Sequence, residues 1–146
     1  MHEGAIELIA RGVLIGPHGI LLCRRANSDF TFLPGGHIHF GESAVAVIVR
    51  ETKEEVGQKV EVSEYFGALE HMYQVERETR HELNLVFLLS GPSLERRSRV
   101  QSLDQGKEFV WCPVNGLSEA NLMPKALRLL VPQWTRGKSI PWSSDL

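Results

Sequence analysis

The sequence predicts a single domain of the α/β class, and three observations lead to that prediction. Its 146 residues suffice for one hydrophobic core. Apolar, β-prone segments alternate with turn signals, and two other segments carry apolar residues at helical spacing. Hydrophobic residues make up 42% and charged residues 23% of the chain, as in globular proteins. We therefore expect one domain over residues 1–146, in an α+β or α/β/α layered arrangement.

The first third of the chain predicts a hairpin and a short strand. Residues 6–15 are apolar and β-prone, residues 16–19 read Gly-Pro-His-Gly, and residues 20–24 are apolar again. This order predicts two strands joined by a tight turn. Residues 27–32 are expected to form a loop that enters a short strand at residues 32–33.

A helix follows. Residues 34–36 (Pro-Gly-Gly) and Gly41 predict a loop before it, Ser43 is the expected N-cap, and Gly57 is the expected end. One stripe of the helix should face the core. It is formed by Val45, Ile48, Val49, Thr52 and Val56.

The second half is expected to be mainly extended. Residues 60–75 predict one or two strands, residues 76–80 a charged turn, and residues 81–89 a strand with alternating faces. Residues 91–107 are polar and predict a mobile loop. Residues 108–113 predict a last strand.

The C-terminal part predicts a second helix and a loose tail. The helix is expected over residues 123–133, broken near Pro132. The tail from Thr135 has few apolar residues and is expected to fray.

An acidic cluster is the main chemical feature of the first helix. Glu51, Glu54 and Glu55 stand at positions i, i+3 and i+4, which lie on one helical face. Three carboxylates crowded together repel each other unless a hard cation offsets their charge. Oxygen ligands of this kind favour Mg²⁺ or Mn²⁺.

The cluster belongs to a longer pattern, G-x5-E-x7-R-E-x-x-E-E-x-G, from Gly36 to Gly57. This pattern resembles the signature of the Nudix hydrolases. Thr52 and Gln58 stand where the family has aliphatic residues, and both are packing positions rather than ligands. The resemblance implies an α/β/α sandwich with a mixed, curved sheet, in which the signature forms a loop–helix–loop.

The resemblance also implies a reaction. Nudix hydrolases use divalent metals and water to cleave a nucleoside diphosphate linked to another moiety. Glu51 and Glu55 are then the principal metal ligands, and Glu54 is a further ligand or the catalytic base. The carbonyl oxygen of Gly36 is expected to complete the metal site.

Three more charged residues take roles by this resemblance. Arg50 orients the glutamates, and Glu42 pairs with Arg50 or binds a second metal through water. Family members often supply one more glutamate from outside the signature, and Glu82 is the candidate here. The alternative, a glutamate at a strand end in water, is weighed equally.

Substrate-binding candidates are fewer. Arg24 or its neighbour Arg25 is expected to contact phosphate, although either can be a solvated edge charge. Phe32 and Tyr73 are the candidates for stacking on a base, with burial in the core as the alternative. Phe66 and Trp111 are further stacking candidates, with burial in the core as the favoured alternative. His37 and His39 could be metal ligands, but they are expected to line the entrance of the site.

Three functions stay open. The first is hydrolysis of a small nucleotide such as a nucleotide sugar, ADP-ribose or a nucleoside triphosphate. The second is action on the 5′ triphosphate of RNA, against which the net charge of −2 argues. The third is a silent module that binds a nucleotide, against which the complete set of three glutamates argues. A homodimer is compatible with all three.

The location of the protein is inferred from its cysteines and its hydropathy. Cys23 and Cys112 lie far apart in strand-like segments, which predicts reduced, buried thiols in the cytoplasm. No apolar run is long enough to span a bilayer, and no secretory leader is expected.

Overall fold

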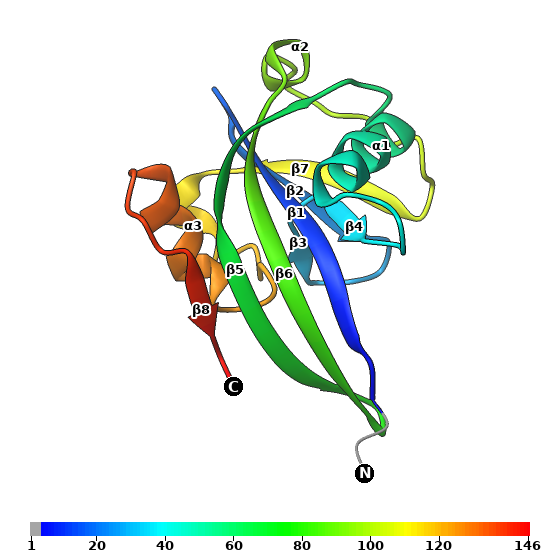
Figure 1. The fold of residues 1–146 in the computed structure, drawn as a ribbon. Coiled ribbons are helices and arrows are strands. Elements are labelled where there is room, and N and C mark those ends of the chain that lie inside the picture. The colour runs from blue at the N-terminus through cyan, green and yellow to red at the C-terminus, as the bar shows by residue number, and fades with distance from the viewer. Residues whose placement is uncertain (1–3) are drawn as a thin grey trace.

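A computed structural model describes residues 4–146 and shows a mixed α+β fold (Figure 1). No helix within these residues is both long enough and apolar enough to cross a membrane. The strands are β1 (Ile6–Gly16), β2 (Gly19–Arg25), β3 (Thr31–Phe32), β4 (Gly35–His37), β5 (Glu61–Val75), β6 (Glu78–Ser90), β7 (Lys107–Cys112) and β8 (Trp142–Ser144), and the helices are α1 (Ala44–Val56), α2 (Pro92–Glu95), the 3₁₀ turn η1 (Val114–Gly116) and α3 (Leu127–Thr135).

The described strands form one eight-stranded sheet in the order β3-β2-β1-β6-β5-β8, with β4 added to β1 and β7 to β2. Strands β1 and β6 are parallel, as are β5 and β8, whereas the other pairs are antiparallel. The two longest strands, β5 and β6, make a hairpin that turns at residues 76–77. The sheet is therefore mixed, as expected.

Two separate cores make the α/β/α layers. Helix α1 lies on one side of the sheet and α3 on the other (Figure 1). Val47 and Ile48 of α1 are fully buried in the first core, and Leu127 and Val131 of α3 are fully buried in the second. Burial of each such side chain contributes about 1.5–3 kcal/mol.

Helix α1 begins and ends where the sequence predicts. The hydroxyl of Ser43 accepts a hydrogen bond from the amide of Ala46, and Gly57 adopts the left-handed conformation with φ 71°. The predicted core stripe is wrong at Val45, which is 43% exposed, whereas Val47 is buried. The buried face is rotated because the helix turns Glu55 towards the sheet, so tertiary packing overrides the apolar pattern.

The predicted loop at residues 34–36 is partly a strand. Strand β4 pairs antiparallel with β1, and a Cβ on Gly35 would overlap the carbonyl oxygen of Ala10. Gly35 also has φ of 146°, which few other residues adopt. The glycines thus permit a close strand contact rather than only a loop.

The C-terminal third departs most from expectation. Helix α3 begins at Leu127, not at residue 123, and continues past Pro132 to Thr135. The tail does not fray, because β8 pairs with β5 and the indole of Trp134 donates a hydrogen bond to the carbonyl of Ile140 at 3.0 Å. The short helix α2 lies within the predicted 91–107 loop.

Candidate functional site

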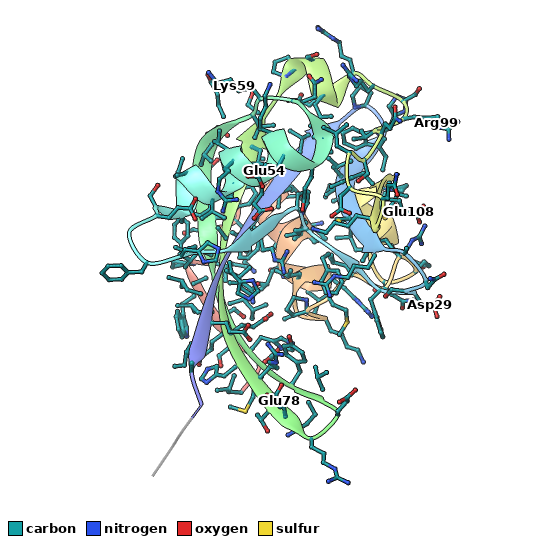
Figure 2. All side chains as sticks on the ribbon, turned by 90° about the vertical axis from the view of Figure 1, so that its right-hand side faces the viewer. Asp29, Glu54, Lys59, Glu78, Arg99 and Glu108 are labelled. Atoms are coloured by element: carbon teal, nitrogen blue, oxygen red, sulfur yellow. The ribbon has the colours of Figure 1, made fainter. Side chains whose placement is uncertain are left out.

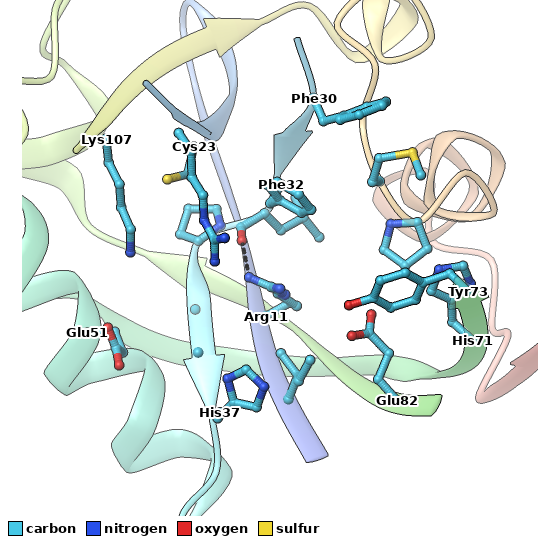
Figure 3. A pocket seen from close by; sticks show the side chains of 18 of the residues that line it. Arg11, Cys23, Phe30, Phe32, His37, Glu51, His71, Tyr73, Glu82 and Lys107 are labelled. Carbon is cyan, nitrogen blue, oxygen red and sulfur yellow. Dashed lines mark hydrogen bonds between the residues drawn. The ribbon is translucent and has the colours of Figure 1, made fainter. Parts of the chain in front are cut away.

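A cavity of about 710 Å³ gathers most of the candidate residues. It is lined by residues from α1 and from strands β1 to β7. In Figure 3, Glu51 lies towards one end with Lys107 above it, and Tyr73, His71 and Glu82 lie towards the other. Arg11 lies between the two groups, so the cavity has two chemically different ends.

Glu51 and Glu55 line the end of the cavity at α1. Glu55 is 7% exposed, and its carboxylate accepts a hydrogen bond from the ammonium of Lys107. Burial raises the pKa of Glu55, and Lys107 opposes part of that rise. No local sequence pattern indicates Lys107, which begins β7 far away in the chain.

The main chain at Gly36 lies directly against Glu51. A Cβ placed on Gly36 would be 2.8 Å from Oε1 of Glu51, closer than such atoms can approach. Any other residue at position 36 would require the Glu51 side chain to move away from the backbone of β4. The structure thus brings together two of the predicted carboxylate ligands and the predicted backbone ligand.

Arg50 contacts Glu42, Glu51 and Glu54 of the signature. Figure 2 labels Glu54, which lies on α1. The guanidinium of Arg50 donates to Glu42 at 2.8 and 3.2 Å and lies 3.3 Å from Glu54 and 3.4 Å from Glu51. This hydrogen bond lowers the pKa of Glu42 below its usual range. The Glu54 side chain is 58% exposed and does not line the cavity, because its contact is with Arg50 on the outside of α1.

Arg11 is a functional candidate that the sequence reasoning missed. Its guanidinium lines the cavity, donates to the carbonyl of Leu33 at 3.0 Å, and lies 5.9 Å from the centre of the Phe32 ring. Burial lowers its pKa, although Glu82 opposes this. A lone arginine inside an apolar strand was the signal that could have identified it.

Only one of the two phosphate candidates, Arg25, lines the cavity. Arg24 forms an ion pair with Glu108 at 2.6 Å and is not among the residues that line the cavity. Arg25 does line the cavity. Successive residues of β2 point to opposite faces, so only one of the two can face the cavity.

Two of the four aromatic candidates lie in the cavity and two lie elsewhere. Phe32 and Tyr73 line the cavity. Phe66 stacks on Trp134 in the core, with ring centres 5.7 Å apart, and Trp111 donates to the carbonyl of Arg97 at 2.8 Å, outside the cavity. The core alternative therefore holds for Phe66 but not for Phe32 or Tyr73.

Glu82 lies in the cavity and not in water. It is 6% exposed and accepts a hydrogen bond from the amide of Asn84 at 3.1 Å. The alternative of a solvated strand-end glutamate is therefore wrong. Figure 3 places Glu82 beside Tyr73, away from Glu51. Its predicted role beside the signature glutamates stays a prediction, which this placement does not favour.

Three further polar side chains also line the cavity. His37 and His39 line the cavity, and His37 is bonded to Glu7 at 2.9 Å, in line with the entrance role expected for both histidines. Cys23 is buried in the wall, and burial together with the charge of Glu55 raises its pKa to about 11. Cys23 and Cys112 are free thiols, as predicted.

The donor set suits Mg²⁺ or Mn²⁺ bound together with substrate. Glu51 and Glu55 supply carboxylate oxygens, and the backbone at Gly36 adjoins them. Within residues 4–146, no group of three or more His, Cys, Asp or Glu side chains is placed to hold an ion alone. Mg²⁺ commonly takes one or two carboxylates and completes its shell with phosphate and water.

Comparisons with known proteins agree with this geometry. A curated ADP-ribose pyrophosphatase from Methanocaldococcus jannaschii is 34% identical over 110 residues, which are 73% of this chain and 61% of that protein. The chain thus spans about three fifths of the length of this relative. A MutT protein from Bacillus halodurans has a similar structure, with a TM-score of 0.69 at 16% identity over 95% of this chain and 88% of that one. The E. coli ORF135 protein gives a TM-score of 0.65 at 24% identity over 90% and 91%.

The family itself follows from a match over most of the chain. The model of the NUDIX domain matches residues 7–133, which include the whole signature from Gly36 to Gly57. On this match, the chain belongs to the Nudix family.

Proposed function

We propose that this protein is a metal-dependent pyrophosphohydrolase that cleaves a nucleoside diphosphate linked to another moiety. Candidate substrates are a nucleotide sugar, ADP-ribose or a nucleoside triphosphate. One observation carries the proposal: Glu51 and Glu55 share one end of a cavity with the close backbone of Gly36 and the cation Lys107. The curated relative that hydrolyses ADP-ribose supports the same class of reaction.

The acidic end is the proposed metal site. Glu51 and Glu55 are the principal ligands, with the carbonyl of Gly36 beside them, and Glu54 remains a further ligand or the base. A bound divalent ion would polarise phosphate oxygens and lower the pKa of an attacking water. Arg50 fixes this group, because its guanidinium contacts both Glu51 and Glu54.

The cations of the cavity are the proposed phosphate contacts. Arg11 and Arg25 line it, and Arg11 has a carbonyl rather than a carboxylate as its hydrogen-bond partner. Guanidinium groups of this kind bind phosphate through charge-assisted hydrogen bonds. Phe32 and Tyr73 offer aromatic faces for a base. Arg24 is left with its partner Glu108, so we expect a smaller contribution from it.

The active form is expected to be a cytoplasmic enzyme acting on small nucleotides. The two buried, free thiols support a reducing compartment. The test is a panel of ADP-ribose, nucleotide sugars and nucleoside triphosphates, each incubated with Mg²⁺ and analysed for nucleoside monophosphate. Water enriched in ¹⁸O identifies attack on phosphorus, because the label then appears in a phosphate product.

The matched variants are Glu51→Gln, which alters the cavity, and Glu61→Gln, which alters an exposed glutamate at the start of β5. We expect turnover of at least one panel member by the wild type and by Glu61→Gln, and its loss in Glu51→Gln. Equal rates in all three proteins would contradict the proposed site.

A further inference from the structure

The end of the cavity away from α1 contains a carboxylate that forms no ion pair with the described residues, although its charge acts on the nearby Arg11. Glu82 is buried, and among residues 4–146 no Lys, Arg or His nitrogen lies within 4.0 Å of it. Its one protein hydrogen bond comes from Asn84. A buried carboxylate is costly unless other groups donate hydrogen bonds to it. The carboxylate is among the groups that line the cavity, so a ligand can reach it.

Asn84 holds this carboxylate in position. It is completely buried on the same face of β6, two residues from Glu82, and its side-chain amide donates a hydrogen bond to Oε1 of Glu82. Its own Oδ1 has no hydrogen-bond partner among the described residues. Glu82 therefore presents acceptor oxygens to the cavity, while Asn84 lies behind it and uses its amide donor to hold it.

A flat wall stands beside Glu82. The rings of Tyr73 and His71 stack with centres 5.1 Å apart and an angle of 14° between their planes. Nδ1 of His71 lies 2.6 Å from Oδ2 of Asp145, which follows β8. Tyr73 and His71 both line the cavity, and Figure 3 shows the Glu82 carboxylate next to the Tyr73 ring. Asp145 thus fixes the wall without lining this cavity.

Charge decides which part of a substrate can lie at this end. A diphosphate would be repelled by Glu82, whereas Arg25 and Lys107 attract it elsewhere in the cavity. A neutral, flat group with hydrogen-bond donors has the opposite preference. It would satisfy the carboxylate and stack on the aromatic wall.

We propose that Glu82 is a specificity-determining residue that accepts hydrogen bonds from two adjacent donors on the neutral end of the substrate, while Tyr73 stacks on that end. The assignment rests on the proposed function, which places the diphosphate near α1. Two parts of a nucleotide carry such a donor pair: the edge of guanine, through N1–H and the 2-amino group, and the two hydroxyls of a ribose.

The first experiment compares Glu82→Gln with Glu61→Gln, using GTP, ITP, ATP and dGTP as probes. Gln has nearly the same shape as Glu but replaces one acceptor by a donor. If guanine is bound, we expect kcat/KM for GTP to fall about 10²-fold in Glu82→Gln. The wild type should also prefer GTP to ITP, which lacks the 2-amino group.

If the ribose is bound instead, Glu82→Gln should impair GTP and ATP equally and leave dGTP almost unchanged. Either pattern supports the proposal. An unchanged kcat/KM for every probe overturns it. An equal fall of kcat for all four probes with unchanged KM also overturns it, since that result marks a residue that acts in catalysis.

A second measurement separates this proposal from the proposed function. Binding of GMP, IMP, AMP and dGMP is measured by calorimetry in EDTA, where no hydrolysis occurs. A Glu82-dependent affinity in a protein that cleaves no pyrophosphate would sustain the subsite and reject the enzyme. Normal hydrolysis with affinities that do not depend on Glu82 would reject the subsite alone.

Asp145→Ala tests the wall. We expect KM to rise about 3- to 10-fold with kcat unchanged, because His71 loses the partner that fixes its stacking on Tyr73. A fall in kcat with constant KM would contradict this positioning role.

Discussion

Glu55 and Glu82 are buried to almost the same degree, with 7% and 6% of their surfaces exposed, yet their surroundings differ. Glu55 accepts a hydrogen bond from the ammonium of Lys107, whereas among residues 4–146 Glu82 accepts a hydrogen bond only from the amide of Asn84 and interacts with Arg11 without an ion pair. Both line the same cavity. Burial therefore does not identify the role of a carboxylate, but the charge of its partners does. These partners support the proposals that the α1 end binds ions and phosphate and that the other end binds neutral donors.

Removal of divalent ions should have the largest effect, and it should act on the α1 end of the cavity alone. We expect EDTA to abolish turnover, because Glu51 and Glu55 cannot offset phosphate charge without a cation. Added Mg²⁺ or Mn²⁺ should restore the rate. Full turnover in EDTA would show that the α1 end needs no metal, and binding of nucleoside monophosphates at the Glu82 end should be unaffected in either case.

Glu55→Gln should have the next largest effect. We expect kcat to fall by a factor on the order of 10² or more, as for loss of a group that stabilises transition-state charge. The rate is measured at saturating metal and substrate, with Glu61→Gln as the control. A rate near that of the wild type would rule out Glu55 as a ligand.

Gly36→Ala should show how tightly the α1 end is built. The new methyl group would displace the Glu51 carboxylate, since no room exists between them, and we expect kcat to fall about 10-fold. Gly116→Ala is the control, because its Cβ would make only ordinary contacts. Thermal melting should show both variants folded; equal kcat values would contradict the close contact.

Lys107→Met should reduce stability by about 1–3 kcal/mol at neutral pH, because it leaves Glu55 buried without a cation. The raised pKa of Glu55 means that ionising it costs stability as the pH rises above about 4.5, and more so in the variant. Burial lowers the pKa of Lys107, but Glu55 raises it by more. The ion pair between Lys107 and Glu55 is therefore lost only above about pH 10.5.

The difference in unfolding free energy between the wild type and Lys107→Met should therefore increase above pH 4.5 and disappear above pH 10.5. Urea unfolding across this range measures it. A gap that persists unchanged at pH 3 would show that lost packing, not charge, is responsible.

Glu82→Gln should have the smallest effect on stability, with the sign opposite to that of Lys107→Met. Because it removes a buried carboxylate that has no ion-pair partner among the described residues, we expect the free energy of unfolding to rise by about 0.5–1 kcal/mol. Urea unfolding of the ligand-free protein measures this change. A loss of more than about 1 kcal/mol would indicate that Glu82 is held by interactions stronger than its bond to Asn84.

Local chemistry made much of the fold predictable. The Ser43 cap, the Gly57 end, the first hairpin and the β5–β6 pair all follow from residues close in sequence. The errors lie where distant contacts decide. Strand β8 exists because β5 accepts it, and a tail with few apolar residues gives no local sign of that pairing.

The site shows the same division. Spacing alone placed Glu51, Glu54 and Glu55 on one helical turn, but which of them faces the cavity depends on how α1 lies on the sheet. Lys107 reaches Glu55 across 52 positions of sequence, and no local pattern reports such a contact. Arg11 was within reach of sequence reasoning, since a charge inside an apolar strand requires an explanation.

Cys23 gives the cavity a chemical property of its own. With a pKa of about 11, its thiol stays protonated at neutral pH and is a poor nucleophile towards alkylating reagents and peroxides. Maleimide labelling should therefore be slow in the folded protein and fast once it unfolds. The same thiol can report on global opening of the molecule without any engineered probe.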